Sequence, residues 1–340
     1  MENLVIKYSV VIPTYGRNKF LAGCLQSIAR QTVSPEEVFV IDNNDNKEYQ
    51  LEVQNIVETC SSNLVKFSYH KGLINSGAVA RNYGASLVIS ELVAFLDDDV
   101  VVDDDYYEKI IQIFKDDNSV AGVQGIDRSL IESFEANVEK KIFGRILLAI
   151  ENFSEHTSIT KGQKAELSPS LAVMHPLPNS DFKVESQWIS TCAGVFKKSL
   201  FNYIEFPKNF VKYSWNEYVY FSHSIFKKNL GKMIYSSDPK YRNIPTDDGR
   251  LPLKDLVYMS EVYDLYIFSE LFNRNLMDRL IFIKSRIGRF LYYLARMIKR
   301  RSFDYNLLGN VLGGFLFTYR NRKSILKGDF KCYNDKFPLN

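Results

Sequence analysis

Short apolar runs alternate with amphipathic stretches along the first third of the chain. The apolar runs are rich in β-branched residues and end at polar or proline turns, which predicts strands at residues 8–13, 37–41, 64–69, 92–96 and 120–126. Helical periodicity between them predicts helices from Asn18, a candidate cap, to about Arg30, then up to about Cys60, and from Asn75 to Leu87. Strands and helices that alternate in this way predict a mostly parallel, doubly wound α/β sheet.

Four residues stand where the predicted strands end, namely Pro13, Asp42, Tyr69 and Asp97. In doubly wound sheets, ligands bind in the crevice beyond the carboxyl ends of the strands. We therefore expect these four residues to line one crevice.

Three consecutive carboxylates, Asp97, Asp98 and Asp99, follow the apolar run that ends at Leu96. Adjacent carboxylates repel one another, so gathering them is costly unless a cation shares the site. Oxygen ligands of this kind suit Mg²⁺ or Mn²⁺, particularly where phosphate oxygens complete the shell. A solvated acidic turn is the alternative, because acidic residues continue at 103–105. This stretch alone leaves both interpretations open.

The turn after the first strand argues against three common nucleotide-binding designs. It contains neither GxGxxG nor GxxxxGK[ST], which disfavours a dinucleotide-dependent oxidoreductase and a P-loop enzyme. A nucleotidyltransferase would usually carry a glycine-rich, basic loop here, and Pro-Thr-Tyr-Gly at 13–16 is not such a loop.

Four segments of the first half occur in a characteristic order. They are Val-Ile-Pro-Thr-Tyr-Gly-Arg at 11–17, Val-Ile-Asp at 40–42, Asn75 with Ala-Arg-Asn-Tyr-Gly at 80–84, and Phe-Leu-Asp-Asp-Asp at 95–99. Together they resemble the nucleotide-sugar-binding half of family 2 glycosyltransferases, whose fold is called GT-A and whose DxD signature falls here on Asp97 and Asp99. The resemblance implies a GT-A domain over residues 1–250, with a donor half at 1–126, an acceptor half at 127–250, and a helical region at 251–340.

The resemblance also implies a role for each matching residue. The implied donor-binding residues are Pro13, Thr14, Tyr15, Arg17, Asp42, Arg81, Asp97 and Asp98. Asp42 would accept hydrogen bonds from the base, and residues 13–15 would wall the base and ribose. Arg17 and Arg81 would meet the diphosphate, since a planar guanidinium matches phosphate oxygens; an ordinary surface position is the alternative for both. Asp97 and Asp99 would hold Mn²⁺ or Mg²⁺, which offsets charge on the departing nucleoside diphosphate.

The second half resembles the family with departures. Glu217 falls where the family's general base stands, and it would take the proton of the acceptor hydroxyl in an inverting transfer. The alternative is a glutamate that only favours a helix N-terminus, where the dipole attracts acids. Thr191 replaces a glycine of the family pattern, Tyr218 an aspartate, and Asn243 a metal-binding histidine. His223 is a candidate substitute for that histidine; the alternative is a structural residue, the more common role of a lone histidine on a helix.

Beyond residue 126 the regular alternation gives way. Residues 127–181 are predicted to be irregular, with one amphipathic stretch near 142–150, and to lie over the acceptor side. From about Asp255 the pattern is helical, and one apolar stripe consists of Leu280, Ile283, Ile287, Phe290, Leu291, Leu294 and Ile298. Arginines populate another face of the same helix, at Arg279, Arg286, Arg289, Arg296 and Arg300.

Charge is spread unevenly along the chain. Residues 271–340 contain 15 basic and 4 acidic side chains, against 28 and 36 in the remainder. A basic amphipathic helix rich in aromatic residues is typical of contact with an anionic membrane surface; a helix packed on the catalytic domain with its basic side solvated is the alternative. Nucleic acid is not expected as a partner, because no recognition motif is present. No stretch is long and apolar enough to span a bilayer.

We therefore expect an inverting, metal-dependent hexosyl- or deoxyhexosyltransferase that acts on a growing, lipid-linked surface glycan, with a UDP-sugar as the first candidate donor. The cysteines are scattered, and the N-terminus lacks the pattern of a secretory signal, which predicts a cytoplasmic protein held at the inner face of the cell membrane. The alternative is a catalytically degenerate protein that binds nucleotide sugar or scaffolds a polysaccharide assembly.

Overall fold

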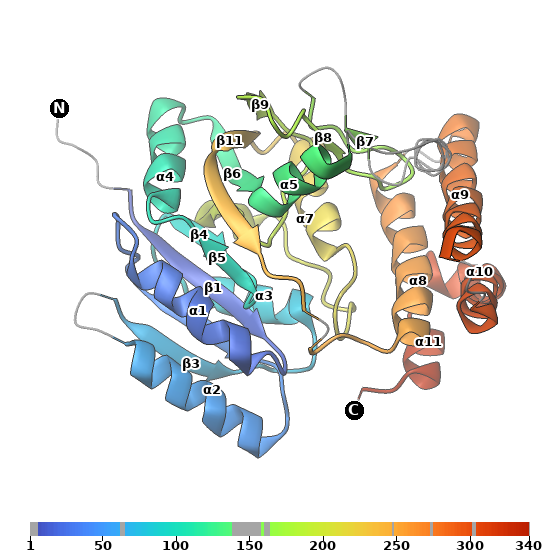
Figure 1. Ribbon diagram of the computed structural model, residues 1–340, viewed down its shortest axis with the longest axis horizontal. Coiled ribbons are helices and arrows are strands. Elements are labelled where there is room, and N and C mark those ends of the chain that lie inside the picture. The colour runs from blue at the N-terminus through green and yellow to red at the C-terminus, as the bar shows by residue number, and fades with distance from the viewer. Residues whose placement is uncertain are drawn as a thin grey trace.

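The computed structural model describes residues 6–61, 65–137, 158–159, 164–246, 248–272, 275–300 and 304–339. Their main feature is a nine-stranded sheet in the order β3-β2-β1-β4-β10-β6-β11-β5, with β9 beside β11 (Figure 1). The strands are β1 (Tyr8–Thr14), β2 (Val38–Asp42), β3 (Phe67–Lys71), β4 (Leu92–Phe95), β5 (Val100–Val102), β6 (Val120–Asp127), β9 (Lys183–Glu185), β10 (Val195–Lys197) and β11 (Lys232–Asn243). A second sheet pairs β7 (Ser158–Ile159) with β8 (Met174–His175).

Most strands of the large sheet run in one direction, as predicted for a doubly wound arrangement. β1 pairs in parallel with β2 and β4, β2 with β3, and β6 with β11. β10 lies antiparallel between β4 and β6, and β5 and β9 run antiparallel to β11. The predicted strands at 8–13, 37–41, 92–96 and 120–126 are confirmed as β1, β2, β4 and β6, whereas β3 begins and ends later than predicted.

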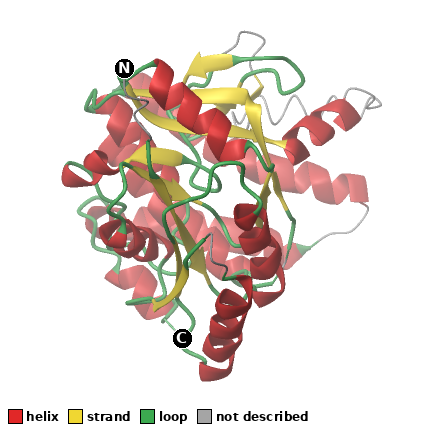
Figure 2. Ribbon diagram, turned by 90° about the vertical axis from the view of Figure 1, so that its left-hand side faces the viewer, coloured by secondary structure: helices red, strands yellow, loops and turns green. Residues whose placement is uncertain are grey.

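Helices cover both faces of this sheet, and the strands lie between them in side view (Figure 2). One core packs α1 (Asn18–Ala29), α2 (Lys47–Cys60) and α4 (Tyr106–Asp116) on the sheet, and the other packs α3 (Gly77–Leu87) and α7 (Glu217–Lys227). Val10 and Ile12 of β1 enter the first core and Val11 the second, because successive strand side chains alternate. A Cβ on Gly84 of α3 would lie 2.3 Å from Val11 Cγ1, so this close approach requires glycine.

Neither Asn18 nor Asn75, which stand at the starts of two predicted helices, caps its helix. Asn18 is the first residue of α1, and its amide donates to Glu52 Oε2 at 2.6 Å. Ser76, not Asn75, caps α3, because Ser76 Oγ accepts a hydrogen bond from the backbone N–H of Val79 at 3.1 Å.

The prediction of an irregular segment over 127–181 is wrong at its start. Helix α5 (Arg128–Asn137) follows β6 directly. The Asp127 carboxylate accepts from the backbone N–H of Ser129 at 2.9 Å, which satisfies one of the free donors at this helix N-terminus. The predicted amphipathic stretch at 142–150 lies outside the described residues.

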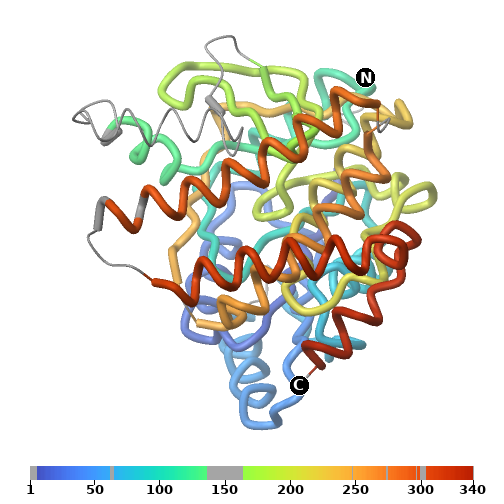
Figure 3. The backbone as a smooth tube through the Cα atoms, turned by 90° about the vertical axis from the view of Figure 1, so that its right-hand side faces the viewer, coloured from blue at the N-terminus to red at the C-terminus, as the bar shows by residue number. Residues whose placement is uncertain are grey.

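The C-terminal region is helical, as predicted. α8 (Leu253–Leu271) belongs to the second core through Met259, Val262 and Tyr263, which are fully buried. α9 (Leu276–Arg300) and α10 (Tyr305–Ile325) run along one side of the molecule, and α11 (Lys331–Lys336) follows (Figures 1 and 3). Among the described helices, none combines the length and apolar character needed to cross a membrane.

Helix α9 is oriented with its apolar stripe outward. Ile283 and Ile287 are 53% and 51% exposed, whereas the side chains of Arg286 and Arg289 are only 11% and 10% exposed. The alternative of a packed helix with its basic side solvated is therefore wrong for Arg286 and Arg289. Helical periodicity shows which residues share a face of α9. It does not show which face packs against the protein, because that depends on buried acidic residues of another helix.

Candidate active site

A cavity of about 320 Å³ opens at the carboxyl edge of β1 and β4. It is lined by the predicted donor residues Pro13, Thr14, Tyr15, Arg17, Arg81, Asp97 and Asp98 and by the predicted base Glu217. Among the described residues, Asp42, Tyr69 and Asp99 do not line this cavity. Of the four residues expected to line one crevice, Pro13 and Asp97 therefore line this cavity and the other two do not.

The three consecutive aspartates form a largely buried cluster that is paired with arginine. Arg17 Nη1 donates to Asp99 Oδ2 at 2.8 Å and to Asp98 Oδ1 at 3.2 Å, and Thr14 Oγ1 donates to Asp98 Oδ2 at 2.7 Å. Burial raises the pKa of Asp98 to about 7 and that of Asp99 to about 6, although Arg17 opposes the shift. The Asp97 side chain is the most exposed of the three, at 25%. A fully solvated acidic turn is excluded.

Arg81 joins the aspartate cluster to the predicted base. From the second turn of α3, its Nη2 contacts Asp97 Oδ1 at 2.6 Å and its Nη1 contacts Glu217 Oε1 at 3.0 Å. Burial raises the pKa of Glu217 to about 7, against the attraction of Arg81. Arg81 Nε has no hydrogen-bond partner within the described part of the chain, a buried donor of the kind that a bound oxygen atom satisfies.

Asp42 is placed differently from the other predicted donor residues. Its side chain is completely buried, and its two oxygens accept from the Asn44 N–H at 2.9 Å and from the Tyr69 hydroxyl at 3.2 Å. Burial raises the pKa of Asp42, and these two hydrogen bonds oppose the rise. Tyr69, which lies in the middle of β3 and not at its end, therefore holds the carboxylate that was expected to receive a nucleotide base.

Comparison with known proteins agrees with this geometry. A model of the family described as Glycosyl transferase family 2 matches residues 9–175, which include β1, β4 and the three aspartates. About half of the chain thus matches the family 2 glycosyltransferases.

Curated relatives match this domain over limited lengths. Validoxylamine A glucosyltransferase of Streptomyces hygroscopicus subsp. limoneus is 35% identical over 104 residues, which is 30% of this chain and 22% of the relative. Minor teichoic acid biosynthesis protein GgaB of Bacillus subtilis is 25% identical, over 44% of this chain and 17% of the relative. Poly(ribitol-phosphate) beta-N-acetylglucosaminyltransferase TarP of Staphylococcus aureus is 28% identical, over 39% and 43%. The chain thus matches less than half the length of each.

Two solved structures resemble the whole fold. GalNAc-T7 with UDP, GalNAc and Mn²⁺ superimposes with a TM-score of 0.53 and 14% identity, over 87% of this chain and 58% of that chain. Mannosyltransferase PcManGT from Pyrobaculum calidifontis, in complex with GDP-Man and Mn²⁺, gives a TM-score of 0.51 and 12% identity, over 98% and 88%. At such identities the likeness shows the fold alone, which is GT-A.

The family 2 domain offers oxygen ligands for a divalent cation at Asp97 and Asp99. No group of three His, Cys, Asp or Glu side chains with metal-binding geometry occurs within the described ranges. The two carboxylates can hold Mg²⁺ or Mn²⁺ only if oxygen atoms of a bound substrate complete the coordination shell. In this structure, Asp99 forms an ion pair with Arg17. Asn243 is near, since it pairs with Val100 across β11 and β5. The donor set fits a cation that arrives together with a phosphate.

Of the two interpretations of His223, the structure supports the structural one. His223 does not substitute for the missing metal histidine, because it is buried on α7 and its Nδ1 lies 3.0 Å from the Gln187 carbonyl oxygen. Burial lowers the pKa of His223 to about 4. Thr191 and Tyr218, the other departures from the family pattern, both line the cavity.

Sequence reasoning missed the loop that carries Glu217 into the cavity. Lys212, Tyr213, Trp215 and Asn216 of this loop also line the cavity. A cluster of aromatic residues before a helix that begins with an acid was the available signal. It did not reveal which residues fix the loop, because they lie on α8 and α9.

Proposed function

We propose that this protein transfers a sugar, with inversion, from a nucleotide-sugar donor to a surface glycan. The main support for the proposal is that the Arg81 guanidinium contacts two carboxylates in the same cavity. One belongs to Asp97 of the DxD signature and the other to Glu217. Donor site and base must be adjacent for a hydroxyl to attack the anomeric carbon while losing its proton.

The donor would lie along the ends of β1 and β4. Arg17 and Arg81 would meet the diphosphate, and a divalent cation on Asp97 and Asp99 would offset charge on the leaving nucleoside diphosphate. Arg17 would exchange Asp99 for phosphate oxygens as the cation takes its place. Asp42 would receive the base by releasing the Tyr69 hydroxyl. A UDP-sugar is the first candidate.

Glu217 would act as the general base. It opens α7, is 6% exposed, and faces Arg81 within the cavity, so it is not a solvated helix-end residue. A carboxylate whose pKa is about 7 combines a populated ionised form with adequate basicity near neutral pH.

The acceptor would approach through a second cavity of about 460 Å³, which shares Tyr218 with the first. Gln124, Asp127 and Ser190 give its wall hydrogen-bonding groups, and no lysine or arginine occurs among its described lining residues. Such a wall suits the hydroxyl groups of a neutral glycan better than a phosphodiester. The names of the teichoic acid relatives support only the broader class of a bacterial surface polymer, because the poly(ribitol-phosphate) in one of these names is a phosphodiester.

A catalytically degenerate nucleotide-sugar binder is the second candidate, and Tyr218 and Asn243 favour it. Incubation with UDP-, GDP-, dTDP- and CMP-sugars, with Mn²⁺ or Mg²⁺ and with a glycan acceptor or water, distinguishes the two. We expect release of free nucleotide from one donor. Binding of a donor without any nucleotide release would instead establish the degenerate protein.

We further propose that α9 and α10 rest on an anionic membrane surface at the cytoplasmic side. Each has exposed apolar residues at helical spacing, including Ile283 and Ile287 on α9 and Leu312 and Leu316 on α10. The strongly basic composition of residues 271–340 supplies the complementary charge.

Replacing Ile283 and Ile287 together by serine should weaken binding to vesicles containing phosphatidylglycerol by about tenfold or more, because insertion of both side chains is lost. Vesicle flotation measures this effect. Ile89→Ser is the control, since Ile89 is 97% exposed and lies outside the C-terminal helices. Equal flotation of all three proteins, or flotation of none, would contradict membrane contact through α9.

A further inference from the structure

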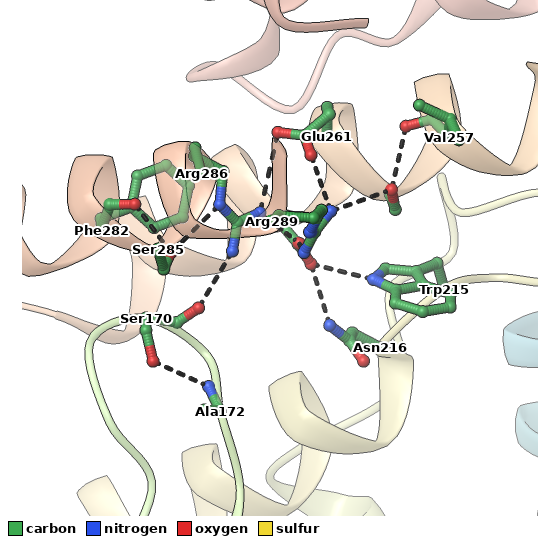
Figure 4. A network of polar contacts seen from close by, with 12 residues as sticks. Ser170, Ala172, Trp215, Asn216, Val257, Glu261, Phe282, Ser285, Arg286 and Arg289 are labelled. Carbon is green, nitrogen blue, oxygen red and sulfur yellow. Dashed lines mark hydrogen bonds and ion pairs between the residues drawn. The ribbon is translucent and has the colours of Figure 1, made fainter. Parts of the chain in front are cut away.

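A buried cluster of four charged side chains joins α8 to α9 (Figure 4). Arg286 Nη1 contacts Asp264 Oδ2 at 2.5 Å, and Arg289 Nη2 contacts the same oxygen at 3.0 Å. Arg289 Nη1 contacts Glu261 Oε1 at 2.6 Å. Two arginines thus balance two acids in a region from which solvent is largely excluded.

Asp264 also reaches beyond the cluster, to Trp215 and Asn216 in the loop before α7. Its second oxygen, Oδ1, accepts from Trp215 Nε1 at 3.0 Å and from Asn216 Nδ2 at 2.8 Å. Burial raises the pKa of Asp264, but Arg286 and Arg289 outweigh it, so the pKa lies below its ordinary value. The arginines therefore keep Asp264 ionised and able to accept from the loop at neutral pH.

The loop that Asp264 holds has an unfavourable backbone. Lys212, Ser214 and Asn216 have φ angles of 54°, 52° and 60°, in the left-handed region that side chains other than glycine rarely adopt. Such conformations persist only where the surroundings fix them. Here α8 supplies the partners, since the Tyr263 hydroxyl accepts from the Val211 N–H at 2.9 Å and Lys212 Nζ contacts Asp255 Oδ2 at 2.5 Å.

This loop leads directly into the base. Trp215 and Asn216 line the cavity, and Asn216 immediately precedes Glu217, the first residue of α7. A small rotation at Asn216 would move the Glu217 carboxylate away from Arg81.

We propose that Asp264 is a positioning residue, which through Trp215 and Asn216 sets Glu217 against Arg81, while Arg286 and Arg289 of α9 contact its other oxygen. The proposal rests on the proposed function in taking Glu217 as the base. A buried ion cluster is weak evidence for stability, because desolvation of the charges offsets their attraction. In the proposed role, Asp264 Oδ2 contacts the arginines of α9, and Oδ1 accepts hydrogen bonds from the loop.

Asp264→Asn tests the proposal, because an amide can accept on one side only and carries no charge. We expect kcat to fall on the order of 10–100-fold, with the dissociation constant of the nucleoside diphosphate unchanged within about twofold, since the loop geometry and not the phosphate site is altered. Asp278→Asn is the control and should match wild type, because Asp278 lies in the first turn of α9 and outside the cluster. Equal kcat in both variants would overturn the proposal.

A second readout does not depend on turnover. The chain has two tryptophans, Trp188 and Trp215. Nitrogen-15 NMR spectra of wild type and of a Trp188→Phe protein assign the indole N–H signal of Trp215. That signal should move in Asp264→Asn and stay in Asp278→Asn; an unmoved signal would overturn the proposal.

The two readouts separate the possible failures. If no donor is turned over by wild type but the Trp215 signal moves as expected, the proposed function fails while the link from Asp264 to the loop stands. If Asp264→Asn does not fold, Arg286→Lys keeps the charge and removes the guanidinium whose Nη1 contacts Asp264 while its Nη2 donates to the Ser170 carbonyl oxygen. It should shift the Trp215 signal, and an unshifted signal would again overturn the proposal.

Discussion

Replacing Glu217 by glutamine is expected to lower sugar transfer by about 10²–10⁴-fold, which is the contribution typical of a positioned general base. The amide is similar in shape and still accepts a hydrogen bond from Arg81, so binding of the nucleotide should be retained. Steady-state transfer assays and nucleotide titrations on both proteins measure the two effects. Glu270→Gln is the matched control, because Glu270 is exposed at the end of neighbouring α8.

The pH dependence of the transfer rate tests the role of Glu217 as the base independently. Because burial raises the pKa of Glu217 to about 7, the wild-type rate should fall about tenfold per pH unit below pH 7, as the base becomes protonated. In Glu217→Gln the residual rate should lose this dependence. Full activity of Glu217→Gln, or a wild-type rate that stays constant down to pH 5, would exclude Glu217 as the base.

Arg81→Ala should destabilise the fold by about 3–5 kcal/mol at pH 8, since it leaves the carboxylates of Asp97 and Glu217 without their partner. The side chains of Arg81 and Glu217 are each only 8% exposed, so solvent cannot replace the lost contacts. Urea unfolding measures the loss.

The sign of the pH dependence follows from proton linkage. Without Arg81, the pKa of Glu217 in the folded protein rises further above its unfolded value of 4.5, so the folded state binds more protons than the unfolded state. The stability of the variant should therefore fall as pH rises from about 4.5 through the raised pKa, and the loss should be smaller at pH 5 than at pH 8. Arg30→Ala, which breaks an exposed pair with Asp104, should cost no more than about 1 kcal/mol. Equal losses for both variants would contradict a buried role for Arg81.

The sequence pattern predicted the fold of residues 1–126 well, for a physical reason. Strand periodicity and short connections fix which residues stand at the carboxyl edge, so the meeting of Thr14, Arg17 and Asp97 could be expected from the sequence alone. Arg81 follows from the same logic, because the helix that precedes β4 must pack on β1. Gly84 permits that close packing, because a Cβ at this position would collide with Val11.

The remaining features depend on contacts between segments far apart in the chain. β10 enters the sheet antiparallel between β4 and β6 from about a hundred residues away, and local periodicity carries no information on such pairing. The buried orientation of Arg286 and Arg289 depends on Glu261 and Asp264, which lie on another helix. Asp42 was placed at the correct strand end, but the hydrogen bond that its carboxylate accepts from the Tyr69 hydroxyl across the β2–β3 pair was not predicted.

The central claim is that the cavity at the ends of β1 and β4 binds a nucleoside diphosphate together with a divalent cation. Titration calorimetry of UDP, GDP, dTDP and CDP into wild type and Asp99→Asn, each with and without Mn²⁺, tests it most directly. We predict that one nucleotide binds wild type more tightly when Mn²⁺ is present, and that Asp99→Asn removes this effect of the metal. Failure of all four nucleotides to bind, or equal binding to both proteins with and without Mn²⁺, would contradict the claim.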